Sequence, residues 1–216
     1  MIKNWINNNI KNATIIEAGM YNGADTFFLS NYAKIIYGFE PIPILFDNIK
    51  NNIEYELSKQ NVKLINKALH SKTGKYKMFF SDLYEKDWGS SSILRPKEHL
   101  IVHPEVTFKT EIEIDAISLD DFIEEQNIEK IDFIWFDVQG SEYDILSNSK
   151  KLNMIDYIYT EVSLIETYDG VKLYPEFRKY MEQNNFSVVF ENLPYKDMGD
   201  VLFKNNTLYK KKNYKK

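Results

Sequence analysis

The segment TIIEAGMYNGADT, over residues 14–26, constrains the fold of this chain more than any other stretch. It begins as a short β-branched run, and it places an acidic residue, Glu17, where another core residue is expected. Two glycines four residues apart, Gly19 and Gly23, follow the run, and the apolar spacing then becomes that of a helix. We interpret the segment as a buried strand, a tight turn and the start of a helix.

The order of strand followed by helix recurs along the chain. KIIYGFE (34–40) is predicted as a second strand, and Ile42–Leu57 as a helix, because its apolar residues recur every three or four positions. Alternating strands and helices are typical of a parallel sheet with helices on both faces. Further strands are predicted at VKLINKAL, IDFIWFD and IDYIYTE, and further helices at SLDDFIEEQN, SEYDILSN and LYPEFRKYMEQNN.

Two regions depart from the parallel pattern. The last two strands, FSVVFE and DVLFKN, are joined by a loop too short for a crossover, so we predict that they are antiparallel. Strict alternation over 106–114 predicts an accessory antiparallel strand, paired with the alternating segment that precedes residue 81. Residues 81–105 show no clear period, and a loop of that length is more often functional than not.

Composition excludes several classes of function. The formal net charge of -5 offers no basic face for nucleic acid. The absence of cysteine excludes disulfides, a thiolate nucleophile and zinc bound by sulfur. We expect a single domain over 1–209 and a basic, disordered tail over 210–216, with weak membrane or nucleic-acid contact as the alternative for the tail. Without a signal peptide or membrane span in the sequence, we expect a cytoplasmic protein.

A ligand is expected at the turn after the first strand, because open parallel sheets bind ligands at the carboxyl ends of their strands. Gly19 and Gly23 let the backbone approach a ligand, and the next helix presents free N–H groups there. The second strand ends at Glu40, about 20 residues after Gly19, the spacing of an acid that hydrogen-bonds ribose hydroxyls. The pattern predicts a nucleotide-like ligand.

The charge of Glu17 indicates which nucleotide-like ligand is favoured. A dinucleotide site has the pattern G-x-G-x-x-G, whereas the glycines here read G-x-x-x-G, and an acid at the strand end repels a pyrophosphate. S-adenosylmethionine carries a sulfonium and an ammonium group but no phosphate, so a carboxylate attracts it. We predict S-adenosylmethionine, with an NAD-type oxidoreductase as the alternative.

From about Thr14 to Lys204 the sequence resembles the FkbM-type methyltransferases, which are S-adenosylmethionine-dependent enzymes. The resemblance implies a Rossmann-like class I methyltransferase fold: a mostly parallel seven-stranded sheet with helices on both faces and an antiparallel C-terminal strand. It also implies O-methylation of a sugar, glycan or other small hydroxylated metabolite. It rests on the order and spacing of IIEAGMYNGADT, YGFEPIPILFDNIKNNI, NKALHSKTGKYKMFF, SSSI, ISLDDFI, IDFIWFDVQGSEYDIL, YIYTEVSLIETYDG and GDVLF.

The resemblance also implies where the cofactor binds. The methionine moiety is expected near Glu17 and the glycine turn, and the ribose at Glu40. The adenine is expected between residues 41–42 and residues 68–69. The predicted cofactor-binding residues are Glu17, Gly19, Tyr21, Asn22, Gly23, Asp25, Thr26, Glu40, Pro41, Ile42, Ala68 and Leu69.

Two carboxylates, Asp137 and Glu161, are predicted to be catalytic. A hydroxyl acceptor must lose its proton, and both residues end apolar strands on the ligand side of the sheet. Burying a carboxylate at the end of an apolar strand costs free energy unless a hydrogen-bond or charge partner is present. His70 is the third candidate base. An alternative role for Asp137 is to orient the ammonium group of the cofactor.

No metal site is predicted. His99 and His103 are four residues apart, but Pro104 and the missing glutamate of H-E-x-x-H argue against a metal pair. Asp137 with residues 120 and 121 offers carboxylates for magnesium, but those two are expected to lie in a helix cap that begins at Ser118.

Two departures from the family pattern weaken the catalytic assignment. Trp135 stands where the family commonly has lysine, and Gln139 where it commonly has glutamate. They support a further alternative, a catalytically degenerate cofactor-binding partner subunit. The loop 81–105 and the segment SLIETYDG are predicted to bind the acceptor, with Tyr84, Trp88 and Tyr168 as residues that either stack on a sugar or anchor the loops.

Overall fold

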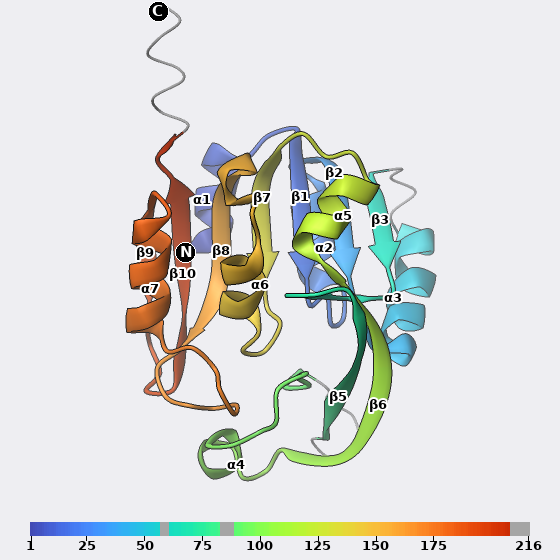
Figure 1. Cartoon of the computed structure of the whole chain (residues 1–216). Helices are drawn as coiled ribbons and strands as arrows, with labels where there is room; N and C mark the ends of the chain where they lie inside the picture. The colour runs from blue at the N-terminus through green and yellow to red at the C-terminus, as the bar shows by residue number, and fades with distance from the viewer. Residues whose placement is uncertain (57–60, 83–88, 208–216) are drawn as a thin grey trace, which may run out of the picture.

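The computed structural model describes residues 1–56, 61–82 and 89–207, and a sheet with helices on both faces forms its centre (Figure 1). Within these residues, seven strands form the main sheet in the order β3-β2-β1-β7-β8-β10-β9. The predicted α/β, Rossmann-like fold class is confirmed. The strands are Ala13–Ala18 (β1), Ala33–Phe39 (β2), Val62–Ile65 (β3), Ile131–Phe136 (β7), Ile155–Ser163 (β8), Phe186–Asn192 (β9) and Met198–Asn205 (β10).

The directions of the strands show at which edge of the main sheet their carboxyl ends lie. β1 runs parallel to β2 and β7, β2 is parallel to β3, and β7 is parallel to β8. β10 is antiparallel to both β8 and β9, which confirms the prediction for the last two strands. The strand order reverses between β1 and β7. Their carboxyl ends therefore form the switch point at which such sheets bind ligands.

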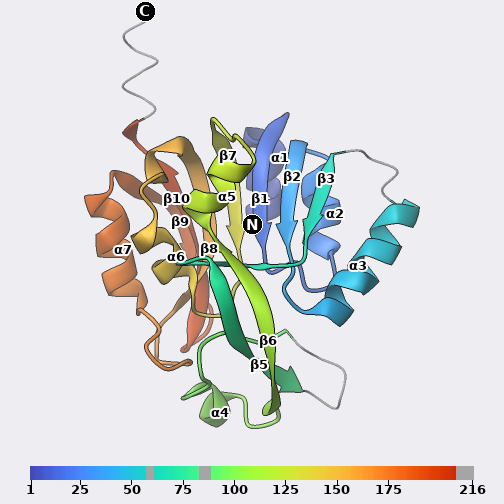
Figure 2. The ribbon, with the colours of Figure 1, turned by 45° about the vertical axis from the view of Figure 1, so that its right-hand side comes forward.

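Helices cover both faces of the main sheet. Ile15 of β1 packs with one group of helices and Ile16 with the other, because successive side chains of a strand point to opposite faces. The first group is α1 (Ile2–Asn9) and α2 (Ala24–Ser30), and the second is α5 (Leu119–Glu125), α6 (Glu142–Asn148) and α7 (Tyr174–Gln183). α3 (Pro43–Glu56) lies beside the β3 edge (Figure 2), and a 3-10 turn, η1 (Leu152–Met154), precedes β8. In the part of the chain that the structure describes, no helix combines the length and the apolar character that crossing a membrane requires.

The sequence patterns do not predict α1. Its residues, IKNWINNN, include several asparagines, which are weak helix formers. Tertiary packing outweighs this preference: Ile6 is fully buried, and Trp5 meets Tyr157 edge-on with 4.8 Å between ring centroids. Burying Ile6 stabilises by about 1.5–3 kcal/mol, which is similar to the summed propensity cost of the four asparagines at up to about 0.7 kcal/mol each, and the packing of Trp5 adds to it.

A smaller three-stranded sheet, in the order β4-β6-β5, lies beyond the carboxyl edge of the main sheet (Figure 1). Its strands are Ala68–His70 (β4), Gly74–Asp82 (β5) and Thr107–Ser118 (β6). β5 and β6 form the predicted antiparallel pair, with Glu113 exposed and Ile114 buried as the alternation requires. The single strand predicted over VKLINKAL is wrong, because β3 pairs in the main sheet and β4 pairs with β6. Asn66 lies between β3 and β4, and its side-chain amide donates to the Glu40 carbonyl at 2.9 Å.

The segment after β5 contains one short helix, α4 (His99–Val102). The chain before α4 joins the loop after β8: Pro96 and Tyr168 form a β-bridge, and the Lys97 N–H donates to the Thr167 carbonyl at 2.9 Å. Tyr84, Trp88 and the predicted basic tail over 210–216 lie outside the described residues.

Candidate active site

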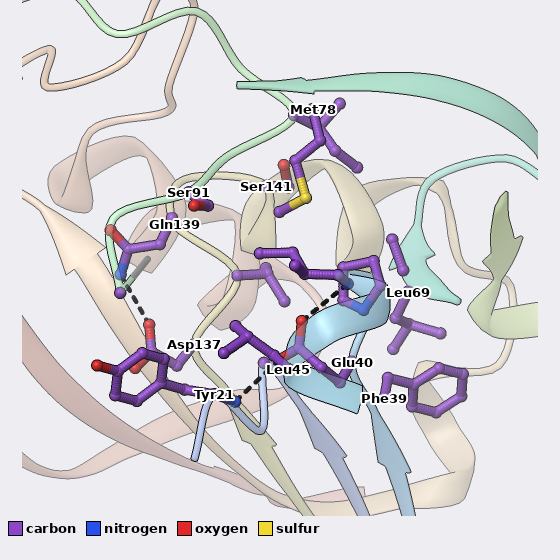
Figure 3. Close-up of a pocket in the computed structure, with 17 residues that line it drawn as sticks. Tyr21, Phe39, Glu40, Leu45, Leu69, Met78, Ser91, Asp137, Gln139 and Ser141 are labelled. Carbon is purple, nitrogen blue, oxygen red and sulfur yellow. Dashed lines mark hydrogen bonds between the residues drawn. The ribbon is translucent and has the colours of Figure 1, made fainter. Parts of the chain in front are cut away.

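A pocket opens at the carboxyl ends of β1, β2 and β7, beneath the smaller sheet (Figure 3). Its empty space, including solvent at the mouth, measures about 730 Å³. It is lined by Gly19, Tyr21, Phe39, Glu40, Pro41, Ile42, Leu45, Ala68, Leu69, Met78, Gly89, Ser91, Ile93, Asp137, Val138, Gln139 and Ser141. The predicted residues among these are Gly19, Tyr21, Glu40, Pro41, Ile42, Ala68, Leu69 and Asp137.

Gly19 sits where the turns after β1 and β7 meet. Its φ is +87°, and a Cβ built there would lie 1.8 Å from the carbonyl oxygen of Asp137. The two turns are joined by the Asp137 N–H, which donates to the Ala18 carbonyl at 2.9 Å. Only glycine fits this close approach, which explains the first glycine of the segment that follows β1.

Glu40 links the turn after β1 to the turn after β2. It is 3% exposed, and its two carboxyl oxygens accept 2.9 Å hydrogen bonds from the backbone N–H groups of Tyr21 and Ile42. Burial raises the pKa of Glu40 to about 7, although the two backbone hydrogen bonds lower it. A carboxylate offers about four acceptor positions, so Glu40 can also accept from a ligand hydroxyl in the pocket.

Apolar side chains form the walls beside Glu40. Ile42, Ala68 and Leu69 are buried, and they line the pocket. The pocket adds Phe39, Leu45, Met78 and Ile93, which sequence reasoning did not assign to the site. Leu45 continues the apolar stripe of α3 and Met78 the alternation of β5, so both patterns are those of core residues and carry no signal of a site.

Glu17 does not line the pocket. It lies in β1 between Gly38 of β2 and Trp135 of β7, and it is 1% exposed. Burial raises the pKa of Glu17 to about 8, with Thr26 lowering it and Asp25 raising it. Among the described residues its Oε2 atom has no hydrogen-bond partner. The protein environment therefore favours the neutral acid near pH 7 unless a cation lies close to it.

The other predicted residues of the first turn lie next to the pocket wall. The Oδ1 atom of Asn22 accepts from the Ala24 N–H at 3.0 Å, and Asn22 lines a neighbouring groove that also contains Tyr21. Gly23 caps α2 in a left-handed conformation. Asp25 pairs with Lys3 at 2.9 Å on the surface.

Asp137 is the second carboxylate that lines the pocket, after Glu40. It follows β7, and its Oδ1 atom accepts a 2.8 Å hydrogen bond from the side-chain amide of Gln139 (Figure 3). Asp137 keeps contact with solvent. The surrounding protein nevertheless raises the pKa of Asp137 by limiting its hydration, while Gln139 lowers it and Asp200 raises it. Such a carboxyl can exchange a proton with a group in the pocket.

A second buried acid, Glu142, fixes the turn that carries Asp137. Its two carboxyl oxygens accept 2.9 Å hydrogen bonds from the backbone N–H groups of Val138 and Gly140. Burial raises the pKa of Glu142 to about 7, although its backbone hydrogen bonds lower it. Sequence reasoning did not identify this acid.

Glu161 lies in β8 opposite Asp200 of β10 and does not line the pocket. Burial raises the pKa of Glu161 well above its usual range, and the nearby Asp137 and Glu142 raise it further. The structure thus brings both predicted catalytic carboxyls into one electrostatic environment, but only Asp137 faces the pocket.

The remaining candidate residues have structural partners. His70 is buried in β4 against the ring of Tyr76, outside the pocket wall. His103 pairs with Asp197 at 3.0 Å. Over the described ranges, no three His, Cys, Asp or Glu side chains are grouped as a metal site.

The two aspartates of α5 also serve the fold. Ser118 caps α5 by accepting from the Asp121 N–H, as predicted, and the Asp121 carboxyl bonds the hydroxyl of Thr73. Asp120 accepts from the Ser149 hydroxyl and the Lys150 N–H. Neither joins Asp137 in the pocket.

Residues 17–188 match the family model of the methyltransferase FkbM domain. The chain belongs to this family. It is therefore a methyltransferase, and S-adenosylmethionine is its expected cofactor. The family argues against the alternative of an NAD-type oxidoreductase.

Two curated relatives extend over most of this methyltransferase. It is 31% identical over 207 residues to the 2-O-methyltransferase NoeI of Sinorhizobium fredii (strain NBRC 101917 / NGR234), covering 90% of this chain and 80% of NoeI. It is 22% identical over 201 residues to the methyltransferase sdnD of Sordaria araneosa, covering 82% of this chain and 74% of sdnD.

Solved structures support the fold of this family member. The methyltransferase FkbM of Methylobacillus flagellatus KT aligns with a TM-score of 0.54 and 13% identity, covering 88% of this chain and 43% of that one. The magnesium protoporphyrin IX methyltransferase of Synechocystis PCC 6803, solved with bound S-adenosylmethionine, aligns with a TM-score of 0.57 and 10% identity, covering 95% and 76%. At these identities the comparison concerns the fold alone.

Proposed function

We propose that this methyltransferase transfers the methyl group of S-adenosylmethionine to a hydroxyl of a sugar, a glycan or another small hydroxylated metabolite. The observation that carries the proposal is one pocket in which the carboxyl of Glu40, an apolar slot and the carboxyl of Asp137 converge. The similarity to a 2-O-methyltransferase over most of both chains supports transfer to oxygen.

The cofactor placement follows the chemistry of the pocket wall. Glu40 suits the ribose hydroxyls, and the slot between residues 41–42 and 68–69 suits the adenine. The turn at Gly19, which ends beside Asp137, suits the methionine moiety, with Asn22 and Gly23 following on the same turn. Glu17, Asp25 and Thr26 support this turn from inside β1 and α2.

Methyl transfer makes two demands on the protein. S-adenosylmethionine, when bound, supplies a methyl carbon activated by its positive sulfur. The pocket must hold the acceptor oxygen in line with that carbon, and such alignment lowers barriers by roughly 7 to 11 kcal/mol in favourable cases. Asp137 is placed to accept the proton of the acceptor hydroxyl, a role that adds about 10² to 10⁴ in rate. Glu161, behind it, is the second candidate base.

Cofactor binding tests the first half of the proposal. At about 100 times its dissociation constant a ligand stabilises by about 2.7 kcal/mol, which corresponds to roughly 5–10 °C in melting temperature. We expect this shift with S-adenosylmethionine and S-adenosylhomocysteine but not with NAD. Glu40→Ala should abolish it, whereas Glu113→Ala, at an exposed position on β6, should leave it unchanged.

Transfer itself tests the second half. We expect methyl incorporation from labelled S-adenosylmethionine into members of a panel of sugars and oligosaccharides, detected by mass spectrometry at oxygen. A melting shift without transfer to any hydroxyl would favour the degenerate partner subunit. A shift with NAD alone would contradict the assignment as a whole.

A further inference from the structure

Gln139 occupies an unusual place beside Asp137. Its φ is +55°, which is uncommon for a residue other than glycine, and the Ser92 hydroxyl donates to its carbonyl at 2.7 Å. Its side chain then does two things at once. The Nε2 group donates to Asp137 at 2.8 Å, and the Oε1 atom accepts from the Tyr168 hydroxyl at 2.9 Å. An amide side chain can donate at one end and accept at the other, which a carboxylate cannot do.

Tyr168 holds the far end of this amide. It is 2% exposed, so its ring has no free face for stacking on a sugar. Its hydroxyl lies between two acceptors, Gln139 Oε1 and the Ser90 carbonyl at 2.7 Å. The backbone around it is fixed, because the Asp169 N–H donates to the Arg95 carbonyl at 2.8 Å. The single proton of the Tyr168 hydroxyl is shared between these two acceptors, and its donation to Gln139 Oε1 favours the amide orientation that turns the nitrogen toward Asp137.

The charges around Asp137 explain why a neutral donor is valuable there. Among the described residues, the carboxyl groups that act on it come from five elements: Glu17 of β1, Asp25 of α2, Glu142 of α6, Glu161 of β8 and Asp200 of β10. The hydroxyls of Tyr159 and Tyr168 also lie close enough to interact with it. All five acids oppose a negative charge on Asp137 when they are ionised. A hydrogen-bond donor on Asp137 has to offset them.

We propose that Tyr168 is a positioning residue for methyl transfer, acting through Gln139 to orient Asp137 and to keep it ionised. The hydroxyl of Tyr168 faces the oxygen end of the Gln139 amide, so the nitrogen end faces Asp137. Without that hydroxyl the amide is free to turn, and its donation to Asp137 weakens. The inference rests on the proposed function, because it gives Asp137 the role of base.

The test compares three variants by a measurement that needs no acceptor. Asp137 is observed by carbon NMR in protein labelled at the aspartate carboxyls, and Asp137→Asn identifies its signal. In Gln139→Leu we expect the titration of Asp137 to move to higher pH, because a hydrogen bond to the charged form is lost. Tyr168→Phe should move it in the same direction but less. In the double variant Tyr168→Phe/Gln139→Leu the shift should equal that of Gln139→Leu alone, because Tyr168 acts through Gln139.

Activity gives the second readout. With an acceptor from the hydroxyl panel, we expect Gln139→Leu to lower kcat about tenfold at pH 7, the loss of one charged hydrogen bond, and to recover most of kcat at higher pH. Tyr168→Phe should lose less and recover likewise. KM for S-adenosylmethionine should stay unchanged in Tyr168→Phe, because Tyr168 does not line the pocket.

Tyr174→Phe is the matched control. Tyr174 is also buried and its hydroxyl also bonds a side chain, Glu191, but it lies on α7 away from the pocket. It should change neither the Asp137 titration nor the pH profile. An unchanged Asp137 titration in folded Tyr168→Phe, or additive shifts in the double variant, would overturn the inference. Absence of methyl transfer by the wild type would instead count against the proposed function and leave the NMR result standing.

Discussion

Two turns at the carboxyl edge of the sheet are each held by a buried glutamate, and they border different parts of the pocket. After β2, buried Glu40 accepts two backbone N–H bonds and faces the pocket. After β7, buried Glu142 accepts two backbone N–H bonds and faces away from it. One acid both shapes a turn and lines the pocket, whereas the other only shapes a turn. A buried acid at a strand end is therefore not by itself a sign of binding.

Glu17 is the contrasting third acid of this edge. Within the part of the chain that the structure describes, no backbone N–H group donates to its carboxyl, and burial raises its pKa to about 8, above the value of about 7 for the other two. The difference follows from hydrogen bonding to the charged form, which lowers a pKa. Bonds from the backbone, more than burial alone, thus separate the three acids.

The largest effect on stability is expected at Gly19, where the turn after β1 touches the turn after β7. Gly19→Ala would place a Cβ 1.8 Å from the Asp137 carbonyl in a left-handed conformation. We expect a loss of more than about 4 kcal/mol in the free energy of unfolding, measured by urea denaturation. Gly170→Ala is the control, because φ is +77° there but no atom lies within 4 Å of the new Cβ. It should cost about 1 kcal/mol, and equal losses at both sites would contradict the importance of the contact.

The second-largest effect is on the pH dependence of the free energy of unfolding. The folded pKa of Glu17, about 8, lies above its usual value of 4.5, so folding favours the protonated form. This contribution is fully present below pH 4.5 and is lost as the pH rises toward 8, where the unfolded chain ionises and the folded protein resists ionisation. We expect the free energy of unfolding to fall by a few kcal/mol between pH 5 and pH 8. Glu17→Gln should flatten this dependence, and an unchanged slope in that variant would place the titration elsewhere.

The smallest expected effect on stability comes from the variants that distinguish Glu142 from Glu40. Glu142→Gln leaves one oxygen to accept from the backbone and should cost about 1–3 kcal/mol of stability. We expect it to lower methyl transfer by disturbing Asp137 while S-adenosylhomocysteine still raises the melting temperature. Glu40→Gln should cost a similar amount of stability but weaken the cofactor shift. If both variants lost cofactor binding alike, the distinction between the two turns would fail.

The sequence predicted the cofactor side of the pocket better than the acceptor side. Gly19 and Glu40 stand at the ends of strands whose apolar patterns are strong, so their positions follow from local spacing. Gln139 and Tyr168 meet across a separation of 29 residues, and only the pairing of two irregular loops brings them together. Their contact leaves no periodic pattern in the sequence.

For other residues the local sequence pattern is clear, but it does not indicate the position that the residue has in the structure. Met78 lines the pocket although its alternation with its neighbours is that of an ordinary core strand. Glu17 has the position of a site residue in the sequence but lies inside the sheet. Gln139 was interpreted as a departure that weakens catalysis, yet its amide donates to Asp137, which a glutamate at that position cannot do at neutral pH.

The place of β10 in the sheet has a consequence for synthesis of the chain. β10 is inserted between β8 and β9, and the amide of Asn205 donates to the carbonyls of Leu152 and Ile155 at the start of β8. The free edge of β8 therefore lacks its native partner until β10 has left the ribosome. During that interval the growing protein presents an open strand edge, which makes this stage the one most exposed to misassociation with other chains.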